Sequence, residues 1–119
     1  MFIKEHEIKA VYIRVDPVDF RKGINGLGSE VDHSFGNSID GKNLFVFTNR
    51  RRDRIKALYW DDTGYALWHK VLEESKFRWP KASDKSVVVT TEQLSWLLSG
   101  LSIEEVKPHP KIEQARQFY

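Results

Sequence analysis

Residues 44–72, LFVFTNRRRDRIKALYWDDTGYALWHKVL, decide the fold of this chain, because apolar and polar side chains alternate there with the period of two that is typical of β-strands. The stretch contains three runs rich in β-branched and aromatic residues, LFVFT, RIKALYW and YALWHKVL. NRRRD connects the first two runs, and DDTG at 61–64 connects the last two with residues that favour tight turns. We therefore predict an antiparallel meander, with KFRW at 76–79 as the candidate for a further strand.

The segment before the meander predicts a strand followed by a helix. VYIRV at 11–15 alternates apolar and polar residues, and Asp16 and Pro17 then supply an N-cap and a first-turn proline. The apolar face of this helix is predicted to comprise Phe20, Ile24, Leu27 and Val31. Three glycines between positions 23 and 28 each cost ~1 kcal/mol in a helix relative to alanine, so we expect the helix to be weak or to break near Gly28. Residues 34–42, SFGNSIDGK, are expected to form a loop.

The segment after the meander predicts a second helix. Thr90 and Gln93 have the spacing of a capping box, and leucines at 94, 97, 98 and 101 form an apolar stripe. Gly100 is the expected terminator of this helix. Apolar groups lie on both faces of the predicted meander near Leu58 and Leu67, so each face needs a cover. The two helices are the candidates for it.

The predicted fold class is α+β, a small antiparallel β-meander of about four strands packed with two helices. The chain has 119 residues, of which 40% are hydrophobic and 30% charged, and this composition is typical of one soluble globular domain. We expect that domain to span 1–107. Residues 108–119, opened by Pro108 and Pro110, are expected to form an extended or disordered C-terminal tail.

The composition argues against several classes of function. Without cysteine there is no disulfide, thiolate nucleophile or cysteine-ligated zinc, and the scattered histidines have no metal-binding spacing. The charged N-terminus has no apolar signal region and no run is long enough to cross a membrane, so we expect a cytoplasmic protein. Asp61 and Asp62 are better explained by turn chemistry than by a two-metal site, and neither a nucleophile elbow nor a Gly-rich phosphate loop is present. We expect no cofactor, no metal and no enzymatic activity.

Positive charge is concentrated in the middle of the chain. Residues 42–81 carry ten Lys or Arg against five Asp or Glu, a local charge of +5, whereas the whole chain carries only +2. Eight of the fifteen aromatic residues lie in the same block. Surfaces that combine cations with rings are typical of proteins that bind polyanions, above all nucleic acids.

Residues 44–80, LFVFTNRRRDRIKALYWDDTGYALWHKVLEESKFRWP, resemble the small TnpB accessory proteins of bacterial insertion-sequence family sixty-six. The resemblance extends to DPVDFRKGINGL at 16–27 and to TTEQLSWLLSGL at 90–101. These proteins are distinct from the RNA-guided nuclease that shares the name TnpB. The resemblance implies a protein that is encoded beside a larger transposase and needed for efficient transposition, and it assigns no molecular activity.

The arginine-rich connection and the strand after it supply the main candidates for contact with phosphate groups, which are Arg50, Arg51, Arg52, Arg54 and Lys56. Planar guanidinium groups at the tip of a hairpin can form bidentate hydrogen bonds to phosphate oxygens. The alternative is a solvated turn in which Asp53 neutralises a neighbouring arginine. We favour binding, because four arginines in five residues exceed what solubility requires.

Other candidates are assigned supporting roles. Weaker electrostatic support is expected from Lys70, Lys76, Arg78 and Lys81. Arg21 and Lys22 either extend the phosphate-binding surface or are ordinary surface residues. Most of the aromatic rings are expected in the core, and Trp79 is the one that we expect to be exposed for stacking on an unpaired base.

Two functions remain open from the sequence. The first is an accessory protein for transposition of an insertion sequence that binds DNA non-specifically through the basic hairpin. The second is an adaptor that binds no DNA and docks on the transposase through the leucine-rich helix, Trp96 or the tail. An exposed Trp96 would favour the adaptor, and its full burial would remove that argument.

Overall fold

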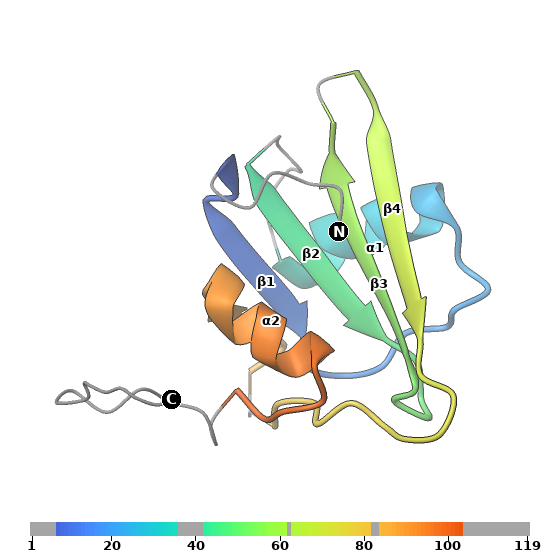
Figure 1. The fold of residues 1–119 in the computed structure, drawn as a ribbon. Coiled ribbons are helices and arrows are strands. Elements are labelled where there is room, and N and C mark those ends of the chain that lie inside the picture. Colours follow the sequence, from blue (N-terminus) through green and yellow to red (C-terminus); the bar gives the residue numbers. More distant parts are fainter. Residues whose placement is uncertain (1–6, 36–41, 62, 82–83, 104–119) are drawn as a thin grey trace, which may run out of the picture.

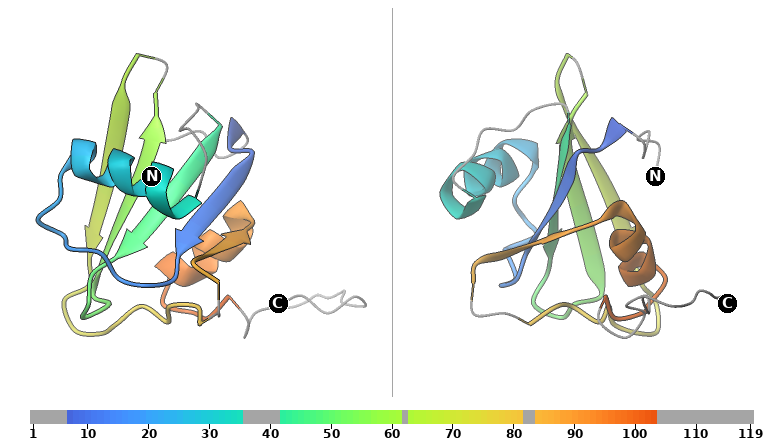
Figure 2. Two further views of the ribbon diagram at one scale, coloured as in Figure 1. Left: turned by 180° about the vertical axis from the view of Figure 1, so that it is seen from behind. Right: turned by 90° about the vertical axis from the view of Figure 1, so that its left-hand side faces the viewer.

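Residues 7–35, 42–61, 63–81 and 84–103 are described by the structure, a computed structural model. Within them a five-stranded sheet lies between two helices, with α1 on one face and α2 on the other (Figures 1 and 2). In chain order the elements are β1 (Ala10–Arg14), α1 (Ile24–Phe35), β2 (Asn43–Thr48), β3 (Arg54–Trp60), β4 (Tyr65–Val71), β5 (Ser86–Val89) and α2 (Thr91–Leu98). The predicted α+β class is confirmed.

The sheet is mixed and has the strand order β4-β3-β2-β1-β5. Strands β2, β3 and β4 form the predicted antiparallel meander, with Phe45 opposite Leu58 and Leu58 opposite Leu67. Strand β1 runs parallel to β2, because the chain crosses from one to the other through α1. Strand β5 then pairs antiparallel with β1, placing Val89 opposite Val11.

The number of strands differs from the prediction of about four, and one predicted strand is wrong. Residues 76–79 form no strand, although their side chains alternate, with Phe77 and Trp79 buried and Lys76 and Arg78 exposed. The alternation arises because Phe77 and Trp79 pack into the core on the α2 side of the sheet, and not because the segment pairs with a strand. The strand that completes the sheet is β5, a short run that lies just before α2 and that the sequence analysis did not identify.

Both faces of the sheet are buried, as the apolar groups on the two sides of the meander predict. The core on the α2 side comprises Val11, Ile13, Leu44, Val46, Ile55, Ala57, Phe77, Trp79, Val89, Leu94, Leu97 and Ile103. The core on the α1 side comprises Leu27, Val31, Phe45, Phe47 and Leu58. Each helix therefore shields one face of the central strands, which is the cover that the sequence predicts (Figure 2).

Helix α1 begins at Ile24, so the predicted start at Asp16 and Pro17 is wrong. The residues before it are engaged in a loop, where the Val18 N–H donates to the Thr48 carbonyl at 3.0 Å. The predicted break near Gly28 is also wrong, because the helix continues to Phe35. Burial of apolar side chains against the sheet offsets the helix-propensity cost of the glycines.

Helix α2 follows its prediction closely. The Thr90 hydroxyl accepts a hydrogen bond from the Gln93 N–H, and the Gln93 side chain accepts one from the Thr90 N–H, at 3.0 and 2.9 Å. These two bonds form the predicted capping box. Gly100 has a φ of +89° and terminates the helix, as expected. Leu101, beyond it, is exposed, so the leucine stripe ends before this residue.

The predicted tail, 108–119, lies outside the described residues. In the part of the chain that the structure describes, no helix has the length and apolar character needed to cross a membrane.

Candidate nucleic-acid interface

The turn between β2 and β3 is organised by the side chain of Asn49. Its Oδ1 accepts hydrogen bonds from the backbone N–H groups of Asp53 and Arg54, both at 3.1 Å, and its Nδ2 donates to Asp53 Oδ1 at 2.6 Å. This bond to the carboxylate, together with the nearby arginine charges, lowers the pKa of Asp53. Asp53 is thus occupied within the turn, and Arg50 and Arg51 extend from it into solvent.

The loop that follows β4 lies against this turn. The Leu72 N–H donates to the Asp53 carbonyl at 2.8 Å, and the Phe77 N–H donates to the Arg52 carbonyl at 2.7 Å. Lys76 and Arg78, on either side of Phe77, are exposed. The four exposed cations Arg50, Arg51, Lys76 and Arg78 therefore lie at one end of the sheet, and we refer to them as the basic end (Figure 1).

The basic end is cationic but not free of acidic groups. Glu73 and Glu74 are exposed in the same loop, whereas Arg54 and Lys81 add exposed positive charge. Arg52 is partly buried and has a φ of +60°, a left-handed conformation that non-glycine residues seldom adopt.

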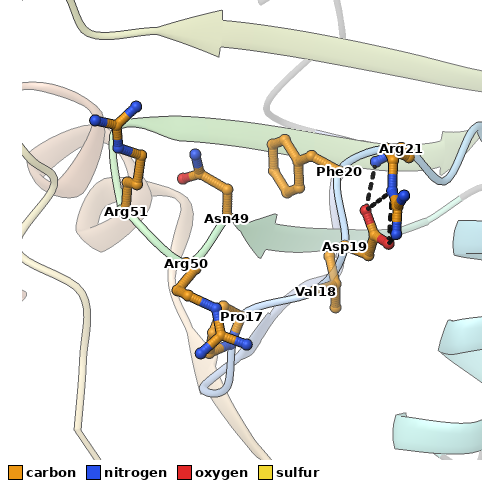
Figure 3. A pocket seen from close by; sticks show the side chains of 8 residues that line it. All are labelled: Pro17, Val18, Asp19, Phe20, Arg21, Asn49, Arg50 and Arg51. Carbon is orange, nitrogen blue, oxygen red and sulfur yellow. Dashed lines mark hydrogen bonds and ion pairs between the residues drawn. The ribbon is translucent and has the colours of Figure 1, made fainter.

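A groove of about 450 Å³ separates the turn from the loop before α1 (Figure 3). Arg50 and Arg51 line it from the turn, and Arg21 lines it from the loop. Arg21 Nη2 lies 2.6 Å from Asp19 Oδ2, and its Nε lies 3.0 Å from each carboxylate oxygen. These hydrogen bonds lower the pKa of Asp19 to about 2, so the pair is ionised over the whole physiological range.

Of the predicted basic pair, Arg21 reaches the groove and Lys22 points elsewhere. Lys22 Nζ lies 2.9 Å from Glu30 Oε1 on α1, and the Glu30 carboxylate also pairs with Arg14. Lys22 therefore joins the loop to α1.

Lys56 is a structural residue, not the phosphate ligand that the sequence predicts. Only 8% of it is exposed, and its Nζ donates to the carbonyls of Phe20 and Lys22 at 2.9 and 3.1 Å. The ammonium also lies 4.8 Å from the centroid of the Phe20 ring. Burial, with a smaller effect of the Arg54 charge, lowers the pKa of Lys56. This lysine fixes the loop before α1 onto the sheet.

Two further candidates are held within the fold. Trp79 was expected to be exposed, but only 5% of it is, and its indole Nε1 donates to the Arg14 carbonyl at 2.9 Å. It therefore has no free ring face for stacking on a base. Lys70 Nζ donates to the Leu98 carbonyl at 3.1 Å, where a cation stabilises the C-terminal end of α2.

Asp61 and Trp96 belong to the other readings of the sequence, and Asp62 lies outside the described residues. The Asp61 N–H donates to the Gly64 carbonyl at 2.7 Å and closes the β3–β4 hairpin. No three Asp, Glu, His or Cys side chains among the described residues are grouped so that they could hold a metal ion. Trp96 has intermediate exposure, so it neither favours the adaptor nor removes it.

Sequence reasoning did not identify Phe20, Asp19 or Asn49 as residues of this surface. The sequence analysis assigned Phe20 to the first helix, but the bonds of Val18 to Thr48 and of Lys56 to the Phe20 carbonyl place it in a loop beside the turn. An Asn just before a turn rich in polar residues was an available signal, since Asn side chains often accept bonds from backbone N–H groups further along the turn.

The comparisons with known proteins agree with the resemblance seen in the sequence. Residues 9–108 match the model of the family described as IS66 Orf2 like protein. The uncharacterized protein y4jC of Sinorhizobium fredii strain NGR234 is 36% identical over 100 residues, which cover 84% of this chain and 86% of y4jC. The uncharacterized protein y4hO of the same strain is also 36% identical, over 92 residues that cover 76% of this chain and 79% of y4hO. No solved structure matches. This chain belongs to the IS66 Orf2-like family, and its role is that of an accessory protein in transposition.

Proposed function

We propose that this accessory protein binds DNA through the basic end, largely without regard to sequence, and that it is not itself an enzyme. In this reading it brings positive charge to the DNA of the insertion sequence while the transposase carries out the chemistry. Such a role places the protein in the cytoplasm, where bacterial DNA lies.

The observation that supports the proposal is the convergence of exposed cations from two distant segments. The backbone bond from Phe77 to Arg52 brings Lys76 and Arg78 beside the turn. Within the described residues, the side chains of Arg50, Arg51 and Lys76 form no hydrogen bond or ion pair, so they can bind phosphate without first breaking a contact.

The lack of sequence preference follows from where the charge lies. Helix α2, TEQLSWLL, contains no Lys or Arg, so it is unsuited to reading guanine in a major groove. Four cations on phosphates give a slope of log affinity against log salt of about −3 to −4 on duplex DNA.

A charge-matched pair of variants tests the proposal. R50Q/R51Q removes two cations of the basic end, and K9Q/K42Q removes two exposed lysines at the opposite end of the sheet, where the Lys9 N–H donates to the Lys42 carbonyl. Fluorescence anisotropy at several salt concentrations should show weaker binding and a slope reduced by ~2 for R50Q/R51Q alone. Equal losses in both variants would mean that only net charge matters.

Absence of binding at low salt would contradict the proposal. It would favour the other function that the sequence left open, docking on the transposase, which can be tested by copurification of the two proteins.

A further inference from the structure

The groove beside the basic end contains an aromatic ring as well as charge. The side chain of Phe20 points from the loop before α1 toward the space beside Asn49, between Asp19 and the arginine turn (Figure 3). A groove volume of about 450 Å³ is on the scale of sites for small ligands, so it is too small for a duplex and suitable for a single nucleotide.

The ring of Phe20 is held in a fixed position. The Lys56 ammonium lies 4.8 Å from the ring centroid, and the His69 ring meets it edge to face with 5.9 Å between centroids. Lys56 also binds the Phe20 carbonyl. A ring that is already ordered loses little conformational entropy when a base stacks on it, and this favours binding.

The charges of the groove are unequal on its two sides. On the loop side the Asp19 carboxylate is neutralised by Arg21, to which it is bound through both oxygens. On the turn side Arg50 and Arg51 have no carboxylate partner among the described residues. A phosphate group is therefore attracted to the turn side, which leaves the base on the side of Phe20.

We infer that this groove binds one unpaired nucleotide of single-stranded DNA, with its base stacked on Phe20 and its phosphate held by Arg50 and Arg51. The inference rests on the proposed function and adds to it a specific ligand, an unpaired nucleotide. In a duplex each base is stacked between its neighbours and has no free face to offer, so the ring can recognise only unpaired DNA.

The test replaces Phe20 with leucine, whose side chain is also apolar but has no aromatic ring. F20L keeps an apolar group over Lys56 but removes the stacking surface, and Y65L removes an exposed ring at the far end of β4 as a control. Both variants are compared with the unaltered chain in anisotropy titrations on a single strand, a duplex and a single strand of abasic sites. Thermal unfolding verifies that F20L remains folded at the assay temperature.

The expected result is a loss in affinity of roughly 5- to 100-fold for F20L on the single strand, with little change on the duplex or the abasic strand and none for Y65L. Equal affinity of F20L and the unaltered chain for the single strand would overturn the inference while leaving duplex binding, and with it the proposed function, intact. A parallel loss on the duplex and the abasic strand would also overturn it, because Phe20 would then act only through the fold. No binding to any of the three by the unaltered chain would overturn both proposals.

Discussion

Cations that lie close together in the sequence differ in burial, so that some are structural and others are exposed. Lys56 and Arg54 are two positions apart on β3, yet Lys56 is buried against the loop before α1 and Arg54 is exposed. Both side chains point to the same face of the sheet, so strand alternation does not distinguish them. The difference comes from the loop that covers Lys56, and the sequence did not reveal that loop. Charge counts along the sequence therefore overestimate the number of cations available to a ligand.

Replacing Lys56 by methionine tests its structural role. Lys56→Met leaves the carbonyls of Phe20 and Lys22 without their buried donor, so we expect the free energy of unfolding to fall by ~1–3 kcal/mol. Urea denaturation measures the change. Arg54→Met, the matched loss of one exposed charge on the same strand, should change stability by less than about 0.5 kcal/mol. Equal effects would show that charge alone accounts for both.

The position of His69 predicts a pH dependence of stability. Partial desolvation and the nearby charges of Lys56 and Arg54 lower the pKa of His69 below its usual 6.5. The folded state therefore resists protonation more than the unfolded state does, so stability is complete above pH 6.5 and declines as the pH falls through the lower folded-state value. Melting temperatures between pH 8 and 5 should fall less in His69→Gln than in the unaltered chain. A parallel decline in both would assign the effect to other groups.

At the level of whole elements, the features that depend on local interactions could be predicted from the sequence. The capping box of α2 and the meander of β2, β3 and β4 depend on neighbouring residues, and both were predicted correctly. The start of α1 and the existence of β5 depend on residues far away in the chain, Thr48 and β1 respectively, and both were missed. The candidate site has the same limitation, since the Arg50–Arg51 turn was recognised whereas its neighbours Phe20 and Asn49 were not.

The N-cap of α2 allows a quantitative prediction. Thr90→Ala removes the hydroxyl that accepts from the Gln93 N–H, so we expect a loss of stability of ~1 kcal/mol. Thr91→Ala, one residue later in the first turn of the helix, retains the cap and should have a smaller effect. Chemical denaturation of both variants distinguishes a specific cap from a general preference for threonine in this region.

At the level of the whole molecule, the basic end depends on contacts that cross the sheet. The indole of Trp79 fastens the loop after β4 to the end of β1, and the same loop holds Lys76 and Arg78. The anchoring of Trp79 at the end of β1 thereby helps to position the charges of Lys76 and Arg78, which the proposed function uses.

Trp79→Phe tests this connection without altering any charge. It leaves the Arg14 carbonyl without its indole donor, and we expect a loss of about 0.5–1.5 kcal/mol in stability and weaker binding to duplex DNA. Urea denaturation and anisotropy titration measure the two effects. Unchanged DNA affinity in a destabilised variant would show that the loop does not need this anchor.

The pairing of β1 with both β2 and β5 has a consequence for how the chain acquires its fold during synthesis. One edge of β1 must wait for Val89 to emerge from the ribosome. Val11, which lies opposite Val89 in β1, is synthesised much earlier. Long-range pairings of this kind slow folding, because a large loop must close before they form. Strand β1 is therefore completed only when the chain as far as β5 has left the exit tunnel, and a nascent chain that stops before Ser86 leaves β1 unpaired along one side.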